Sequence, residues 1–223
     1  MRPLIFSFSA LLTLAHIAAL GSAARSPQQG ASGRGRQTAE VARIESYCKG
    51  IDQYLKSAPK AVRYFVNARP EDAAGSRAAE RWYEVKSGDE LTDAERSYAT
   101  ESISVLTKAG AIVYALIGEP MEHSRHDDAY YFREDGALAK ISSGYWSNMA
   151  EMRILRENFY DSSGKLLQST SQCFQLSYTS GGSSREKRVS CARGDMKREI
   201  REYRFPIYKR SSDLPGYALL KKS

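Results

Sequence analysis

The stretch AYYFREDGALAKIS, residues 129–142, decides the fold class of this chain. Its centre, Asp135-Gly136, is the strongest short-range signal for a β-hairpin, because glycine adopts the left-handed backbone that tight turns need. This turn predicts that Tyr130 lies opposite Ile141 on an apolar face that packs in a core. The opposite face mixes aromatic and cationic side chains, which predicts a partly solvated surface. The other predicted pairs are Glu134 with Ala137, Phe132 with Ala139, Tyr131 with Lys140, and Arg133 with Leu138.

A second hairpin follows in ENFYDSSGKLLQSTSQCF, residues 157–174. Asp161 and the two serines after it fit a type I turn, with Gly164 in the left-handed conformation. Both hairpins have the order aromatic, acidic, glycine, leucine. This similarity reflects either an internal repeat or convergent turn chemistry.

Short runs rich in Val, Ile, Tyr and Phe continue on both sides of these hairpins. The connections between them are too short for the crossover helices that parallel strands require, so the pattern predicts an antiparallel meander of about six to eight strands. In the stretch between two of the runs, Thr92 to Glu95 fits a capping box that would open a short helix. The predicted strands are residues 62–67, 98–106, 111–117, 129–134, 137–142, 152–160 and 165–178, with 81–85 as a further candidate.

Residues 39–57 predict an amphipathic helix. Apolar residues recur there at spacings of three and four, and charged residues occupy the rest of the helical wheel. The helix should end before Pro59, and its apolar stripe needs a surface to cover it. We therefore expect a single α+β domain at residues 39–223, with an N-terminal amphipathic helix packed on a twisted antiparallel sheet. The stripe consists of Val41, Ile44, Cys48, Ile51 and Leu55.

The N-terminus predicts export. An apolar run at residues 4–20 is followed by small residues that suit a signal peptidase, so residues 1–24 are expected to be a signal peptide. Residues 25–38 are rich in Gly, Ser, Gln and Arg without an apolar period, which predicts a flexible linker. No later stretch is long and apolar enough to span a bilayer, so we expect a periplasmic or secreted protein without a transmembrane segment in its mature chain.

The three cysteines fit an oxidising compartment. In a hairpin centred on Gly182, Cys173 would lie opposite Cys191, and a disulfide there would add about 3 kcal/mol by the chain-entropy model. Cys48 would then be a buried, inert thiol on the helix stripe. The alternative bonds Cys48 to one of the other two, because connectivity does not follow from sequence alone.

Three segments carry a resemblance: YYFREDGALAKI at 130–141, NFYDSSGKLLQST at 158–170 and PIYKRSSDLP at 206–215. Together they resemble a group of small exported bacterial proteins of unknown function that have a YYFRxDGxLAKI hairpin and a YDxxGKLL hairpin. The resemblance implies the same strand order and export, and it implies no activity. The second hairpin alone also resembles a YD-type repeat of secreted proteins.

Charge is distributed unevenly. The chain has 33 Lys and Arg against 26 Asp and Glu, and residues 185–210 alone hold ten basic and four acidic residues. If residues 195–205 are helical, a cationic stripe lies beside an apolar one. This surface would suit an anionic envelope component or an acidic protein partner. Export argues against nucleic acid, and a solvated basic face without a ligand is the alternative. The candidate anionic-ligand residues are Arg193, Lys197, Arg198, Arg201 and Arg204.

Catalytic and metal signals are sparse. The mature chain holds two histidines, His123 and His126, which with Asp127 could bind zinc or copper. The spacing is not the helical one of metalloprotease ligands, and no motif marks a serine nucleophile. We therefore expect a non-enzymatic binding or interaction module without a cofactor. The alternatives are a metal-dependent or hydrolytic enzyme centred on this histidine loop, an immunity-type protein, and a structural envelope protein.

Overall fold

A computed structural model describes residues 30–68, 81–97, 99–178, 184–192, 194, 196, 198 and 205–221; side chains at 30–34, 178 and 184 are not described. The predicted signal peptide and the first five residues of the predicted linker lie outside these residues. No helix within them is long and apolar enough to cross a membrane.

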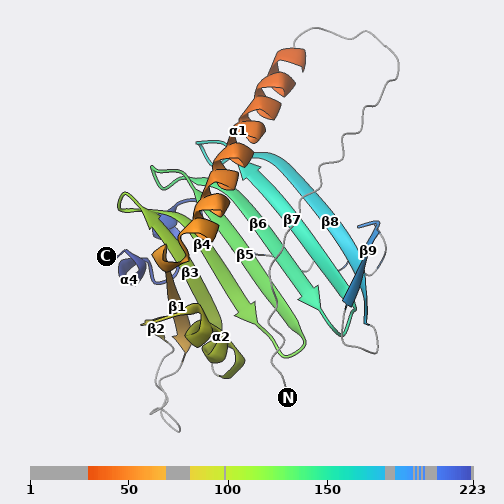
Figure 1. Ribbon diagram of the computed structural model, residues 1–223. Helices are drawn as coiled ribbons and strands as arrows, with labels where there is room; N and C mark the ends of the chain where they lie inside the picture. Colours follow the sequence, from red (N-terminus) through yellow and green to blue (C-terminus); the bar gives the residue numbers. More distant parts are fainter. Residues whose placement is uncertain are drawn as a thin grey trace.

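The strands form a single nine-stranded antiparallel sheet (Figure 1). Their order across the sheet is β2-β1-β3-β4-β5-β6-β7-β8-β9. From β3 to β9 every strand pairs with the next one along the chain, which confirms the predicted antiparallel meander. The candidate strand at 81–85 is β2, and β9 brings the sheet to one strand more than the predicted upper limit of eight. The strands are β1 (Val62–Ala68), β2 (Arg81–Val85), β3 (Glu101–Lys108), β4 (Ala111–Pro120), β5 (Ser124–Phe132), β6 (Leu138–Ser147), β7 (Met152–Tyr160), β8 (Leu166–Tyr178) and β9 (Ser184–Val189).

The β5–β6 hairpin has the predicted register in its centre, where Tyr130 pairs with Ile141. Near the turn the prediction is wrong by one residue. The loop has three residues instead of two: the Arg133 amide donates to the Ala137 carbonyl at 2.8 Å, and Gly136 is left-handed with φ +79°. A type I turn followed by a left-handed glycine adds this residue and creates a bulge. The predicted pairs Glu134 with Ala137, Phe132 with Ala139, and Arg133 with Leu138 are therefore replaced, and Phe132 pairs with Leu138.

The β7–β8 hairpin uses the same turn. The Gly164 amide donates to the Asp161 carbonyl at 3.0 Å, and Gly164 has φ +81°, which confirms the predicted type I turn. Its register also shifts next to the turn, between Phe159 and Tyr160. Both hairpins thus have the same bulge at the same position.

Helix α1 (Gly30–Ser57) lies across one face of the sheet, here called the α1 face (Figure 1). Val41, Ile44 and Cys48 are buried in one cluster with Tyr131 and sheet residues from β3 to β7. The Tyr131 hydroxyl donates to the Asp52 carboxylate at 2.8 Å. Tyr131 is 7% exposed, so the prediction of a partly solvated face around it is wrong. The hairpin is buried on both faces, because a second layer covers each of them.

The C-terminal segment, residues 205–221, lies on the opposite face. It contains the helices η3 (Ser211–Asp213) and α4 (Tyr217–Leu220). Leu214 and Leu220 are buried with strand residues from β1 to β7, and the Tyr130 hydroxyl donates to the Pro206 carbonyl at 2.8 Å. This segment therefore covers the face of the sheet that α1 does not cover.

Two helix boundaries differ from the predictions. Helix α1 begins at Gly30 and so extends into residues 30–38, which the sequence assigned to a linker; once a helix has formed, each added residue gains a hydrogen bond. Helix α2 (Gly88–Ser97) begins before the predicted capping box at Thr92. Its cap is Ser87, whose hydroxyl accepts the Glu90 amide at 3.2 Å. The Glu90 carboxylate in turn accepts the Lys86 amide at 2.7 Å. The motif Ser-x-x-Glu at 87–90 is the one that starts the helix.

Candidate anion-binding surface

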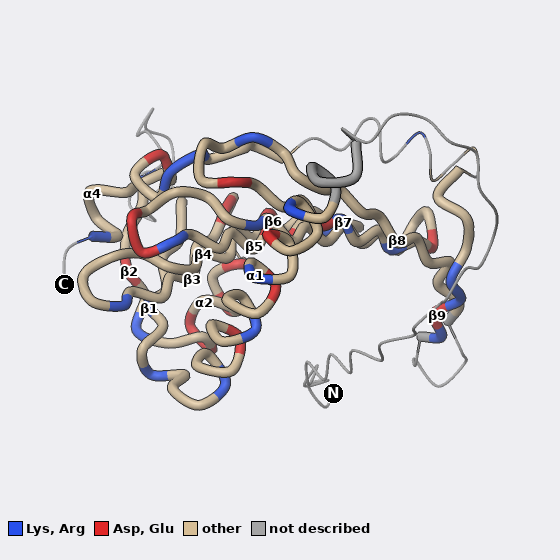
Figure 2. The backbone as a smooth tube through the Cα atoms, turned by 90° about the horizontal axis from the view of Figure 1, so that it is seen from above, with Lys and Arg blue, Asp and Glu red and all other residues tan. Residues whose placement is uncertain are grey.

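Strand β9 is the last strand of the sheet, and β8 is its single neighbour in the described part of the chain. Its cations Arg185, Lys187 and Arg188, called the β9 cations below, are all exposed. Side chains alternate along a strand, so Arg188 lies on the α1 face beside its partner Phe174, whereas Arg185 and Lys187 lie on the opposite face. Figure 2 shows the positive segments of β9 at one end of the molecule.

The carboxylate of β9 is already engaged. Glu186 accepts a hydrogen bond from Arg153 of β7 at 2.7 Å, between Nη1 and Oε1. Among the described residues no carboxylate forms an ion pair with any of the β9 cations. The edge strand therefore presents positive charge that its own acid does not neutralise.

A row of aromatic and cationic side chains crosses the α1 face next to β9. Its members are directly opposite one another on adjacent strands: Trp146 on β6, Arg153 on β7, Phe174 on β8 and Arg188 on β9. The Arg153 guanidinium carbon lies 5.2 Å from the centre of the Trp146 ring and 5.8 Å from that of Phe174. These distances are those of cation–π contacts. The row holds Arg153 in place, and through it Glu186.

The six-membered ring of Trp146 packs over Gly144, which has no side chain to displace it. A Cβ at Gly144 would lie 2.6 Å from Cη2 and 2.8 Å from Cζ3 of the Trp146 ring, both far inside contact distance. Gly144 and Trp146 project from the same face of β6, two residues apart. The indole of Trp146 therefore packs directly against the backbone of Gly144.

Arg125 continues the row onto β5, but it is fully engaged. Its guanidinium donates to Glu95 of α2 at 2.7 Å and to Asp127 at 2.8 Å. Ser102 donates to the same Glu95 carboxylate at 2.5 Å. Burial raises the pKa of Asp127 above its ordinary value, although the bonds to Arg125 oppose that shift. This network ties α2 to the sheet and offers no free cation to a ligand.

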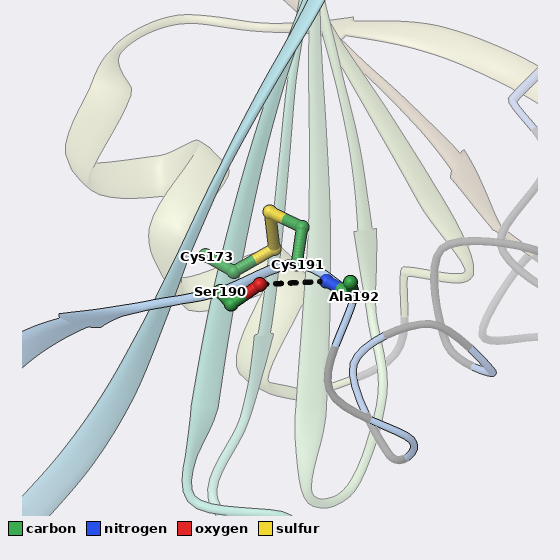
Figure 3. The surroundings of a disulfide bond; sticks show 4 residues. All are labelled: Cys173, Ser190, Cys191 and Ala192. Atoms are coloured by element: carbon green, nitrogen blue, oxygen red, sulfur yellow. Dashed lines mark hydrogen bonds between the residues drawn. A yellow bond between two sulfur atoms is a disulfide. The ribbon is translucent and has the colours of Figure 1, made fainter.

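The disulfide joins Cys173 to Cys191, which confirms the predicted pair and excludes the alternative with Cys48 (Figure 3). The predicted register is wrong, since Cys173 pairs with Val189 rather than with Cys191. Hairpin register depends on loop length and turn type, and the midpoint of the serine and glycine run is a poor guide to either. The bond, with a Cα–Cα distance of 5.3 Å, fastens the end of β9 to β8.

Cys48 is a buried free thiol, as predicted. It is 2% exposed on the stripe of α1, and burial raises its pKa to about 12. At neutral pH it is a protonated, unreactive group.

The candidate residues on the predicted basic helix are described only at Arg198, which is exposed and helical. Arg193, Lys197, Arg201 and Arg204 lie outside the described residues. On the predicted apolar stripe, Met196 is 1% exposed and packs with Ile154, Cys173 and Met152.

The positive charge of residues 185–210 does not gather in one patch. Arg210 forms a bridge with Ala137 in the β5–β6 turn, and the carbonyl of Lys209 accepts the Leu138 amide. That turn lies at the end of the sheet where β8 begins, whereas β9 pairs with the last residues of β8. The cations at the two ends of this segment are therefore at opposite ends of the sheet.

The histidine loop does not assemble the predicted ligand set. His123 is in the turn before β5, and His126 and Asp127 are consecutive residues within β5, so they project from opposite faces. His126 lies 3.9 Å from Glu119 and packs against the Tyr145 ring, and burial lowers its pKa. The described residues contain no group of three or more His, Cys, Asp or Glu that could hold a metal ion.

Sequence reasoning missed Trp146, Arg153 and Phe174. They lie on three different strands, and only the registers of β6, β7 and β8 bring them together. No single strand pattern marks them, since Trp146 follows another aromatic residue, Tyr145, and Phe174 follows Cys173. Comparisons with protein-family models, curated proteins and solved structures find no match for this chain.

Proposed function

We propose that this protein is an exported, non-enzymatic binding module that holds an anionic partner along the β9 cations. The observation that carries the proposal is an edge strand with three exposed cations whose own carboxylate, Glu186, is bound to Arg153. Unbalanced charge on an accessible edge attracts an opposite charge and steers its approach. An anionic envelope component and an acidic protein both fit this description.

Export is part of the proposal. The N-terminal sequence has the pattern of a signal peptide, and the Cys173–Cys191 bond suits an oxidising compartment. The resemblance to small exported bacterial proteins points the same way. Export also argues against nucleic acid as the partner.

We also infer that α1 is a permanent layer of the domain. The supporting contacts are the buried cluster around Ile44 and Cys48 and the bond from the Tyr47 hydroxyl to the Phe132 carbonyl at 2.6 Å. With α1 in this place, no described helix covers the β9 end of the α1 face (Figure 1). The binding surface is then the sheet edge and the row beside it.

No observation in the described part of the chain favours an enzyme. The side chains of His126 and Asp127 lie on opposite faces of the sheet, and Arg125 donates a hydrogen bond to the Asp127 carboxylate. The binding function rests on exposed charge alone and needs no catalytic group.

The test compares two variants with the same loss of charge. Arg185, Lys187 and Arg188 are changed to Ser in one, and the exposed lysines Lys56, Lys60 and Lys108 in the other. Binding to poly-L-glutamate, heparin and phosphatidylglycerol vesicles is measured at about 50 and 300 mM salt. A cation near an anionic surface contributes about 1 kcal/mol, so the first variant should bind on the order of a hundredfold more weakly.

The lysine variant should retain most of the affinity, and high salt should weaken binding of the unmodified protein. Equal losses in the two variants would show that net charge, and not β9, holds the ligand. Failure of the unmodified protein to bind any of the three probes would contradict the proposed function.

A further inference from the structure

We propose that the anionic partner is an extended acidic polypeptide segment, which adds to the sheet beside β9 as a tenth strand. This inference rests on the proposed function and specifies the chemistry of the partner and its mode of binding.

The outer side of β9 has the backbone groups that strand addition requires. In an antiparallel strand the hydrogen-bonding groups alternate in direction, so about half of the amides and carbonyls of Ser184–Val189 point away from β8. No strand of the described chain pairs with that side. A free edge of this kind is a template for another chain.

The placement of the cations suits a single extended chain. Arg185 and Lys187 project from one face of β9 and Arg188 from the other. A strand lying in the plane of the sheet would have side chains about 4.5–5.5 Å from those of β9 on both faces. Acidic residues in that strand could therefore meet all three cations. A flat anionic surface laid on one face would meet the cations of that face only.

The same charges disfavour a second copy of this chain. Strand β9 has three cations and Glu186, so two copies side by side would bring a charge of +2 next to +2. Cationic edge strands prevent self-association for this reason. An acidic strand is attracted by the same cations that repel a second copy of this chain, so β9 prefers an acidic partner over its own copy.

The edge is also held in its binding conformation. Six residues of β9 pair with β8, and the Cys173–Cys191 bond fastens the end of the strand. On the α1 face, Glu186 is held by Arg153, which packs between Trp146 and Phe174. A rigid edge loses little conformational entropy on binding.

The test uses the purified protein and an eight-residue peptide with the repeat Glu-Glu-Thr-Thr, blocked at both ends, which places Glu on both faces of an added strand. The control peptide has the same sequence with its four central amides N-methylated, which keeps every charge and removes hydrogen-bond donors from both edges. We expect the unmodified peptide to bind at least about tenfold more tightly than the control. Hydrogen exchange at residues 184–189 should slow at least about tenfold when it binds.

The variants give a second readout. Serine at all three β9 cations should weaken peptide binding roughly a hundredfold, and serine at Lys56, Lys60 and Lys108 should leave it nearly unchanged. Equal affinity for the two peptides, or no added protection in β9, would overturn strand addition while leaving binding of anions intact. Binding to phosphatidylglycerol vesicles without binding to the peptide would overturn it in favour of a lipid surface. Binding to neither would overturn the proposed function as well.

Discussion

Replacing Gly144 with alanine should displace the Trp146 ring and destabilise the domain. The new Cβ would lie 2.6 Å from the nearest ring carbon, whereas carbon atoms pack at about 3.5–4.0 Å, so the ring must move by about 1 Å. Overpacking of this kind costs about 1–3 kcal/mol, and weakening the Arg153 contact with the ring costs about 0.5–1 kcal/mol more. Gly144 is not among the positive-φ residues, so alanine fits the backbone and regains about 0.4–1 kcal/mol of chain entropy. The expected net loss is about 0.5–3.5 kcal/mol, centred near 2 kcal/mol.

Urea unfolding measures this loss, and tryptophan emission measures the ring displacement. The chain has two tryptophans, so a Trp82→Phe background makes Trp146 the sole reporter, and its emission should shift to the red in Gly144→Ala. Gly50→Ala is the matched control. Gly50 lies inside α1 with nothing within 4 Å of a Cβ, so the change should stabilise by about 0.5–1 kcal/mol. A Gly144→Ala protein with unchanged emission and equal or higher stability would refute the packing described for Trp146.

Three further predictions concern the rest of the domain. With a pKa raised to about 12, the Cys48 thiol should have roughly a thousandfold less thiolate at pH 8 than an ordinary thiol. A disulfide reagent should therefore label Cys48 at least about a thousandfold more slowly in the native protein than in urea. Similar labelling rates would contradict the burial of Cys48. The bond with Arg63 lowers the pKa of Glu84, and the stability this adds is present above the ordinary value of 4.5 and lost as pH falls through the lowered one. Glu84→Gln should therefore cost up to about 1 kcal/mol at pH 7 for this half-exposed pair, and the cost should shrink as the pH falls below 4.5; a cost that does not change with pH would contradict the pairing. Reducing the Cys173–Cys191 bond should lower the free energy of unfolding by about 3 kcal/mol, and unchanged stability in reductant would show that it constrains little.

The meander was predictable because its signals are local. Gly136 and Gly164 mark the turns, and the alternating side chains beside them set which residues share a face. The one-residue shift at Phe132 was not predictable from the same dipeptide, because a two-residue and a three-residue loop differ by a few torsion angles. The burial of Tyr131 depends on α1, which is distant in sequence.

The candidate surface was only partly predictable. Charge counting pointed to residues 185–210, and Arg185, Lys187 and Arg188 are exposed there, but the helix was expected to be the binding element rather than the edge strand. The row of Trp146 and Arg153 depends on the registers of several strands. Such contacts between strands follow from the folded sheet and not from any single segment.

The most direct test of anion binding at β9 is to follow the backbone amide resonances of the protein while poly-L-glutamate is added at about 50 mM salt. The account predicts that the largest shifts fall within residues 184–189 and on Arg153, and that they reverse at about 300 mM salt, because screening weakens exposed charge pairs. Shifts confined to other parts of the chain, or shifts that persist at high salt, would contradict it.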